Sequence, residues 1–237
     1  MQEKSFRDYL FSPNNNQSIK KTEIYLFHKF TIMATLDFSQ LPGLSLFSLQ
    51  GKAAILTGGT KGLGLAMAAG LASAGADVLL VSRNAQDGQE SAAEISEKYG
   101  VKALTFAADV TDQKGMEAMT AFAMESFGKI DILVNSAGIN IRGAIDELSQ
   151  SEFDQVMNVN VTGTWLACKA VIPQMKKQGK RSTINPASTL GLVGLAKRTP
   201  YTASKGAVVQ ITRGLGLELA TGISPSMRFA RVHSSQK

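Results

Sequence analysis

The sequence predicts an α/β fold, a single Rossmann-type, doubly wound parallel sheet. Three observations support this prediction. From residue 52 onward, short apolar runs alternate with segments of helical periodicity, which is typical of βαβ units. A glycine-rich turn, 57–64, lies directly between the apolar run 53–56 and a helix of small residues, 65–74. No apolar run approaches the roughly 18 residues that a membrane-spanning helix needs.

The strands are expected where apolar runs are short, and the helices where apolar residues recur every three or four positions. In chain order, strands are expected at 53–57, 77–82, 102–108 and 130–135, with another near 182–187. Helices are expected at 62–74, 86–99, 113–127, 151–176 and 200–220. The third helix shows the logic, because Met116, Met119, Ala123 and Phe127 form one stripe and Gly128 follows as a stop.

The length and composition bound the class of protein. The 237 residues, 44% of them hydrophobic, suffice for one sizeable α/β domain. Cys168 is the single cysteine, so no internal disulfide forms, which fits a reducing, cytoplasmic location. The two histidines, His28 and His233, lie near the ends of the chain. A histidine-based catalytic triad or a histidine-rich metal site in the core is therefore excluded, and no metal is expected.

The net charge of +6 is concentrated at the two ends of the chain. Residues 1–35 hold five basic and three acidic side chains, and residues 221–237 hold three basic side chains and no acidic one. The remainder is close to neutral, so the domain offers no basic face for nucleic acid. We expect neither a nucleic-acid nor a membrane partner.

The chain divides into two parts by composition. Residues 1–35 contain the polar cluster 13–18 and show no clean periodicity, so we expect a disordered extension. Residues 36–237 are expected to form one Rossmann-type dinucleotide-binding and catalytic domain.

The glycine turn predicts a phosphate site. Its glycines Gly58, Gly62 and Gly64 follow the pattern G-x-x-x-G-x-G. Without Cβ atoms they permit a sharp turn and let a pyrophosphate approach the backbone. The helix N-terminus that follows leaves N–H groups unpaired and attracts anions. The alternative is a tight strand-to-helix connection that binds no ligand.

The end of the second strand favours NADP(H) over NAD(H). An acidic residue there would bind the adenosine ribose of NAD, but Ser82 and Arg83 occupy the position. Lys61 lies in the facing glycine turn, and two cations would bind a 2′-phosphate well. The alternative is that both are solvated surface cations.

Two further strand ends offer contacts to a nucleotide. Asp109 ends the third strand, where its carboxylate either accepts from the adenine amino group or caps the next helix. The fourth strand ends in Asn135-Ser136-Ala137-Gly138, whose small residues let the backbone lie against a cofactor. Asn135 is expected to tie neighbouring strands through its side chain. The alternative is a simple turn.

A tyrosine and a lysine in one helix suggest acid–base chemistry. Tyr201 and Lys205 are four residues apart after Pro200, so both project from one helical face. A neighbouring ammonium favours tyrosinate and lowers a phenol pKa that is ordinarily near ~10. Ser188 lies thirteen residues before Tyr201, at the end of the fifth expected strand, where a hydroxyl would hold a substrate carbonyl. Asn160 lies in an apolar helix and needs a partner such as bound water.

Together these residues resemble the classical short-chain dehydrogenase/reductase family, nearest its gluconate dehydrogenase and 3-oxoacyl-carrier-protein reductase branches. The resemblance implies that Tyr201 protonates the carbonyl oxygen, Lys205 lowers the tyrosine pKa and holds the nicotinamide ribose, Ser188 orients the substrate, and Asn160 anchors a water. It implies an NADP site formed by Gly58, Thr60, Lys61, Gly62, Leu63, Gly64, Ser82, Arg83, Asp109, Val110, Asn135, Ala137, Gly138, Tyr201 and Lys205. It also implies a small carbonyl or alcohol substrate and a homodimer or homotetramer.

The sequence departs from the family pattern in two places. After Ala220 it does not continue as family members do, so the C-terminal strands and the substrate lid are expected to be missing. Pro186 interrupts what is expected to be a continuous apolar strand, where it would displace Ser188. Two hypotheses follow: an NADP(H)-dependent oxidoreductase that interconverts ketones and secondary alcohols, or a non-catalytic family member that binds only cofactor or a partner.

Overall fold

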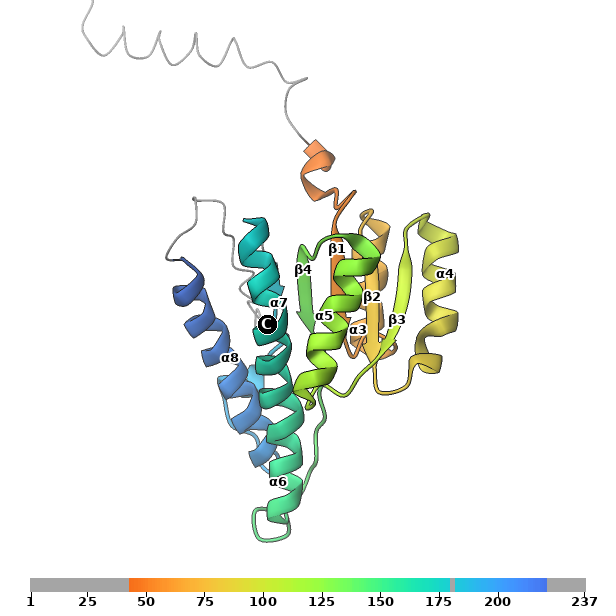
Figure 1. The fold of residues 1–237 in the computed structure, drawn as a ribbon. Coiled ribbons are helices and arrows are strands. Elements are labelled where there is room, and N and C mark those ends of the chain that lie inside the picture. The colour runs from red at the N-terminus through yellow and green to blue at the C-terminus, as the bar shows by residue number, and fades with distance from the viewer. Residues whose placement is uncertain (1–42, 180–181, 221–237) are drawn as a thin grey trace, which may run out of the picture. The chain divides into compact units, whose positions relative to one another are not determined.

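The structure, a computed structural model, describes residues 43–179 and 182–220 (Figure 1). The expected extension at 1–35 and the segment after Ala220 lie outside these residues. Contacts divide the chain into Met1–Leu46 and Phe47–Lys237. The fold described below is that of the second unit.

A single parallel sheet of five strands forms the centre of this unit, in the order β3-β2-β1-β4-β5 (Figure 1). The strands are β1 (Ala53–Thr57), β2 (Asp77–Ser82), β3 (Ala103–Ala107), β4 (Ile132–Asn135) and β5 (Ser182–Ile184). The strand order reverses between β1 and β4. In open parallel sheets, ligands bind beyond the carboxyl ends of the strands at such a reversal.

Helices cover both faces of the sheet, which confirms the doubly wound α/β fold. One face packs on α3 (Gly62–Ser73) and α4 (Gln89–Tyr99) through a core that includes Leu56, Leu80 and Val134. The other packs on α5 (Gln113–Phe127), α7 (Gly163–Gln178) and α8 (Thr199–Ala220) through a core that includes Ile55, Leu79 and Leu133. Successive strand residues point to opposite faces, so each buried strand is apolar throughout.

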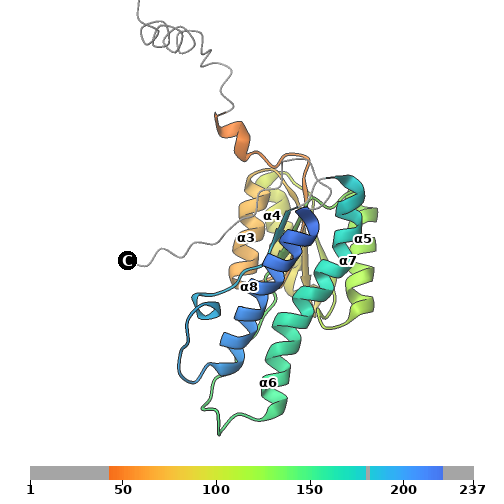
Figure 2. The same ribbon diagram turned by 90° about the vertical axis from the view of Figure 1, so that its left-hand side faces the viewer.

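The helix expected at 151–176 contains a break in its hydrogen-bonding pattern. It consists of α6 (Gln150–Met157), a π-helical turn η4 (Asn158–Thr162) and α7. Ser149 and Glu152 form a capping box at its start. α8 lies alongside this composite helix (Figure 2). Such π-turns are frequent at functional sites.

The strand expected near 182–187 is shorter than predicted. β5 ends at Ile184, and Pro186 lies beyond the ladder. Because proline has no N–H to donate, the strand ends before it, and the proline does not interrupt the sheet. The short helix η5 (Thr189–Gly191) follows and leads to α8.

Residues 43–179 and 182–220 contain neither a membrane-spanning helix nor a cluster of metal-binding side chains. No helix there has the length and apolar character required to cross a bilayer. No group of three or more His, Cys, Asp or Glu side chains there is arranged to hold a metal ion.

Candidate active site

The glycine turn is packed tightly against the end of β4. Gly58 has a φ of +65°, and a Cβ atom there would lie 2.8 Å from the backbone N and Cα of Ala137. A Cβ atom on Gly64 would overlap the carbonyl oxygen of Gly58. Only glycine fits either position, so the two glycines are what permits the tight strand-to-helix turn that the phosphate hypothesis requires.

The N-terminus of α3 opens from this turn. Lys61 is its N-cap, and its side chain makes no capping hydrogen bond. The first turn contains no acidic residue, so its backbone N–H groups have positive character and no local carboxylate to neutralise it. Lys61 and Leu63 are exposed, whereas Thr60 is buried. A helix end of this kind is suited to an anionic ligand.

The ends of β2 and β3 lie side by side at the same edge. Ser82 donates through Oγ to the carbonyl of Asn84 over 2.6 Å, and the Arg83 side chain is exposed. Asp109 accepts from both the N–H and the hydroxyl of Thr111 at 2.8 Å. These bonds, with a smaller contribution from the Arg83 charge, hold the pKa of Asp109 below its usual value.

Of the two roles weighed for Asp109, the helix cap belongs to another residue. Asp112 accepts from the N–H groups of Lys114 and Gly115 and is the N-cap of α5. Val110, which follows Asp109, is buried against the start of α7, where a Cβ atom on Gly163 would come within 2.6 Å of its Cγ2.

Asn135 ties neighbouring strands, as its position in the sequence suggested. Its Nδ2 donates to Oδ1 of Asn185, just beyond β5, at 2.8 Å and to Sγ of Cys168 at 3.2 Å. Asn185 in turn donates to the hydroxyl of Thr212 on α8 at 3.0 Å. Burial raises the pKa of Cys168 to about 11, so this thiol is structural rather than nucleophilic.

Asn160 is held from two directions in the π-turn. Its Oδ1 accepts from the N–H of Ile139 at 2.8 Å, and its Nδ2 donates to the Ile139 carbonyl at 2.9 Å. The same Nδ2 donates to Oγ of Ser204 at 3.0 Å. Protein groups are therefore partners of this buried polar side chain, for which the sequence predicted a partner such as bound water.

Tyr201 and Lys205 lie on one face of α8, with the Lys205 Nζ 5.7 Å from the centre of the tyrosine ring. The Lys205 ammonium donates to the carbonyl of Pro186 at 2.8 Å, and burial lowers its pKa. Ser204 donates through its hydroxyl to the Tyr201 carbonyl at 2.8 Å. The helical turn of α8 that carries Tyr201 is thus linked through Ser204 to Asn160.

Ser188 lies on a segment that contacts Lys205 on both sides. Pro186, two residues earlier, accepts from the Lys205 ammonium. Gly191, three residues later, lies so close to Lys205 that a Cβ atom added to it would be 2.7 Å from the Lys205 carbonyl oxygen. The Ser188 Oγ accepts from the N–H of Leu190 at 3.2 Å, so it begins η5. Ser188 is therefore held beside the helical turn of Lys205.

A continuous series of contacts joins the glycine turn to the tyrosine and lysine. Gly58 abuts Ala137, and a Cβ atom on the neighbouring Gly138 would lie 3.2 Å from Oδ1 of Asn160. Asn160 is bonded to Ser204, which adjoins Lys205. The candidate phosphate site and the candidate acid–base pair thus share the carboxyl edge of the sheet.

Sequence reasoning assigned no role to three of the groups that build this site. Ser204 connects Asn160 to α8, the Pro186 carbonyl holds the Lys205 ammonium, and Asn185 receives the Asn135 amide. A signal existed for Asn185, since a polar residue within a strand expected to be apolar needs a partner. The Pro186 carbonyl carried none, because any residue type has one.

Comparisons with known proteins agree on one family. A family model described as short chain dehydrogenase matches residues 52–225. The 2-(R)-hydroxypropyl-CoM dehydrogenase of Xanthobacter autotrophicus is 40% identical over 172 residues, which are 71% of this chain and 69% of that protein. The gluconate 5-dehydrogenase of Gluconobacter oxydans is 39% identical over 173 residues, 73% of this chain and 67% of that protein.

Solved structures agree with this result. A short-chain type dehydrogenase/reductase from Mycobacterium marinum superposes with a TM-score of 0.72 at 35% identity, covering 75% of this chain and 71% of that one. An NAD⁺-bound xylitol dehydrogenase superposes with a TM-score of 0.70 at 33% identity, covering 73% and 66%.

Proposed function

The chain belongs to the short-chain dehydrogenase/reductase family, and on that premise we propose that it is an NADP(H)-dependent oxidoreductase that interconverts a ketone and a secondary alcohol. The observation that supports this most directly is the series of contacts from Gly58 through Asn160 to Lys205. The relatives are named as dehydrogenases and reductases, so the non-catalytic alternative is not favoured. The direct test is ketone-dependent oxidation of NADPH by the full-length chain.

In the proposed mechanism the Tyr201 hydroxyl donates its proton to the carbonyl oxygen during reduction. The Lys205 ammonium, fixed by the Pro186 carbonyl and 5.7 Å from the tyrosine ring, stabilises the tyrosinate that remains. Ser188 orients the substrate oxygen, and Asn160 holds the Ile139 backbone and α8 in register. The chemistry that a bound nicotinamide supplies is hydride transfer to the carbonyl carbon.

The residues at the carboxyl edge of the sheet suit a phosphorylated dinucleotide. The glycines permit a tight turn into α3, and the N-terminus of α3, which has no side-chain cap, favours a pyrophosphate. Lys61 and Arg83 are both exposed near the ends of β1 and β2, where they would hold a 2′-phosphate. Asp109, deprotonated at neutral pH, remains a candidate acceptor for the adenine amino group.

Replacing Arg83 by leucine is expected to weaken NADPH binding by about 10- to 100-fold, the worth of a charge-assisted hydrogen bond. NADH binding should change by less than threefold, because NADH has no 2′-phosphate. Dissociation constants from nicotinamide fluorescence measure both effects. Lys98→Met is the matched control, because it removes an exposed cation from the last turn of α4. Equal affinity of the unmodified chain for NADH and NADPH would contradict the proposed preference.

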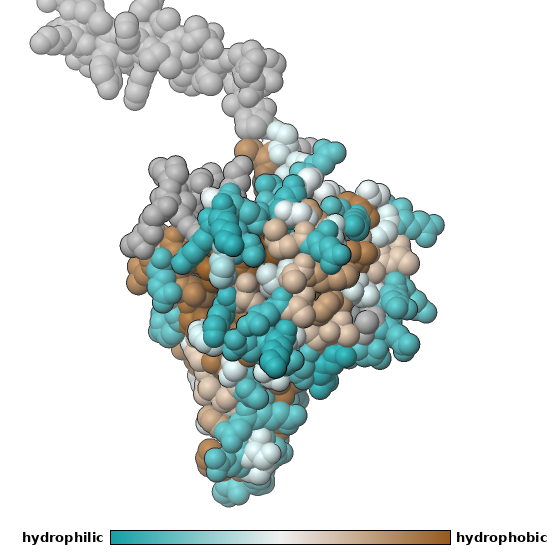
Figure 3. All heavy atoms as spheres, viewed as in Figure 1, coloured by the Kyte–Doolittle hydropathy of each residue, from teal (hydrophilic) through white to brown (hydrophobic). Residues whose placement is uncertain are grey.

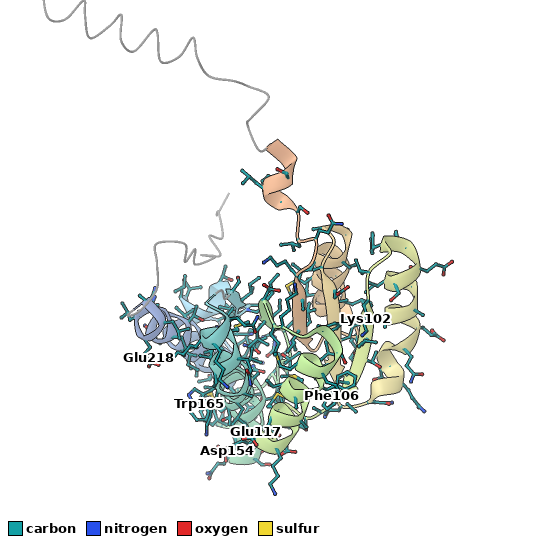
Figure 4. The ribbon with its side chains drawn as sticks, turned by 45° about the horizontal axis from the view of Figure 1, so that its top comes forward. Lys102, Phe106, Glu117, Asp154, Trp165 and Glu218 are labelled. Atoms are coloured by element: carbon teal, nitrogen blue, oxygen red, sulfur yellow. The ribbon has the colours of Figure 1, made fainter. Side chains whose placement is uncertain are left out.

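We also propose that the chain forms a homodimer or homotetramer through α7 and α8. Trp165 on α7 is 46% exposed and Leu217 on α8 is 75% exposed. Hydrophobic side chains lie over these helices at the left of Figure 3. Trp165 and Glu218 come from the two helices on one side of the molecule (Figure 4).

A cytoplasmic location remains a prediction from the cysteine content.

Replacing Trp165 by glutamate is expected to shift the chain toward monomer, because it places a charge in an apolar interface. Sedimentation equilibrium at micromolar concentration measures the change, with an expected rise of at least tenfold in the dissociation constant. Phe47→Glu, at an exposed aromatic outside both helices, should leave the mass unchanged. A monomeric unmodified chain would refute the assembly proposal.

A further inference from the structure

A hollow with a strongly positive rim lies beside the start of α8. Its volume is about 430 Å³, and three basic residues, Arg142, Lys197 and Arg198, line it together with Glu147 and Leu195. The lining comes from two loops, one between β4 and α6 and the other between η5 and α8. Both loops lie at the same end of the molecule (Figure 2).

The hollow is connected through the backbone to the proposed acid–base pair. Arg198 lies three residues before Tyr201, and its carbonyl accepts from the N–H of Thr202 at 2.8 Å, so it belongs to the turn that leads into α8. On the other loop, Gly143 lies four residues after Ile139, whose backbone is held by Asn160. Each of the two loops is therefore joined by a short stretch of chain to a residue of the candidate site.

Lys197 is held in a conformation that L-residues rarely adopt. Its φ is 58°, and within residues 43–179 and 182–220 no other non-glycine residue has a positive φ. The N–H of Gly143 donates to its carbonyl at 3.3 Å, which joins the two loops across the hollow. Backbone strain of this kind concentrates at ligand sites, where the surrounding structure maintains it.

The charges around the hollow do not cancel one another. Glu147 is the acidic side chain that lines it, and its Oε2 accepts from the N–H of Ala144 at 3.1 Å. Two arginines and one lysine therefore line the hollow together with a single carboxylate residue. A guanidinium is a planar group whose paired N–H donors match two oxygens of a carboxylate or a phosphate, and pockets of about 300 to 1,000 Å³ hold small molecules.

We propose that this hollow, lined by Arg142, Lys197 and Arg198, binds an oxyanion group of the substrate and so selects acidic carbonyl or alcohol compounds. The proposal rests on the proposed function, because it assumes that Tyr201 is the reacting side chain. The substrate class is a small acyclic hydroxy or keto compound that carries a carboxylate or phosphate. Neutral alcohols of the same length are discriminated against.

Binding to the full-length chain without cofactor tests the inference separately from catalysis. Calorimetry would compare D-gluconate, D-glucitol 6-phosphate and neutral D-glucitol, which share a six-carbon polyol chain. We expect at least one of the two anions to bind tenfold or more tightly than glucitol, and the tighter one identifies the oxyanion. Arg198→Met and Lys197→Met should each reduce that preference by about tenfold.

Two matched variants sharpen the result. Glu147→Gln should raise anion affinity by about threefold, because it removes the opposing charge and its amide oxygen can still accept from Ala144. Lys98→Met, which removes a distant exposed cation, should leave the preference unchanged. Absence of anion binding, equal binding of glucitol, or a preference that survives both basic-residue variants would overturn the inference.

Measurements of enzymatic turnover test the proposed function separately from the anion site. Oxidation of neutral alcohols by NADP⁺ without any anion preference would leave the proposed function intact and refute the hollow as an oxyanion site. Anion preference in the binding experiment, with no turnover of any carbonyl compound, would count against the oxidoreductase and not against the hollow.

Discussion

Replacing Tyr201 by phenylalanine is expected to lower kcat for ketone reduction by about 10³-fold, while NADPH affinity changes by less than threefold. The substitution removes one oxygen, the only group of Tyr201 that can donate a proton to the substrate. General acid catalysis contributes about 10²- to 10⁴-fold in enzymes. Steady-state NADPH oxidation gives kcat, and nicotinamide fluorescence gives the affinity.

Tyr99→Phe is the matched control, since Tyr99 lies on α4 against the opposite face of the sheet. This variant should retain full activity. Circular dichroism would confirm that both variants fold. The role assigned to Tyr201 would be wrong if its phenylalanine variant kept more than a tenth of the original kcat.

Replacing Gly64 by alanine is expected to destabilise the chain by about 3 kcal/mol or more. A single methyl group at this position would overlap the carbonyl oxygen of Gly58, and both partners belong to rigid backbone. The turn must open, which also displaces Gly58 from its packing against Ala137. Thermal unfolding should show a fall in Tm of roughly 6–12 °C, and NADPH should no longer raise the Tm.

Gly70→Ala provides the control on the same helix. Gly70 is exposed on α3, and nothing lies within 4 Å of a Cβ atom placed there. Because glycine is a poor helix former, this substitution is expected to stabilise the chain by about 0.5–1 kcal/mol. If Gly64→Ala were as well tolerated as Gly70→Ala, the close packing of the turn would not be needed for folding or for cofactor binding.

The order of strands and helices could be predicted from the sequence because each element has a local pattern. Buried strands appear as short apolar runs, and α5 shows its stripe of Met116, Met119 and Ala123. The ends of elements were less predictable. β5 stops at Ile184 rather than near residue 187, and the helix expected at 151–176 contains a π-turn at Asn158–Thr162. Both depend on which distant groups the backbone meets.

The residues of the candidate site could be predicted from the sequence, but the groups that they contact could not. The identities of Tyr201, Lys205, Ser188 and Asn160 could be proposed from motif and spacing, since each residue type implies a chemistry. Their partners could not. The Pro186 carbonyl that fixes Lys205 is a backbone group found at every position, so no sequence pattern marks it.

The sequence by itself determined the fold class, the glycine turn and the residue types available for acid–base chemistry, because periodicity and side-chain chemistry are local properties. Only the tertiary structure decided that Asn160 is satisfied by Ile139 and Ser204, and that Arg142, Lys197 and Arg198 surround one hollow. These contacts join segments tens of residues apart. Their geometry follows from how the helices pack on the twisted sheet, which no local pattern encodes.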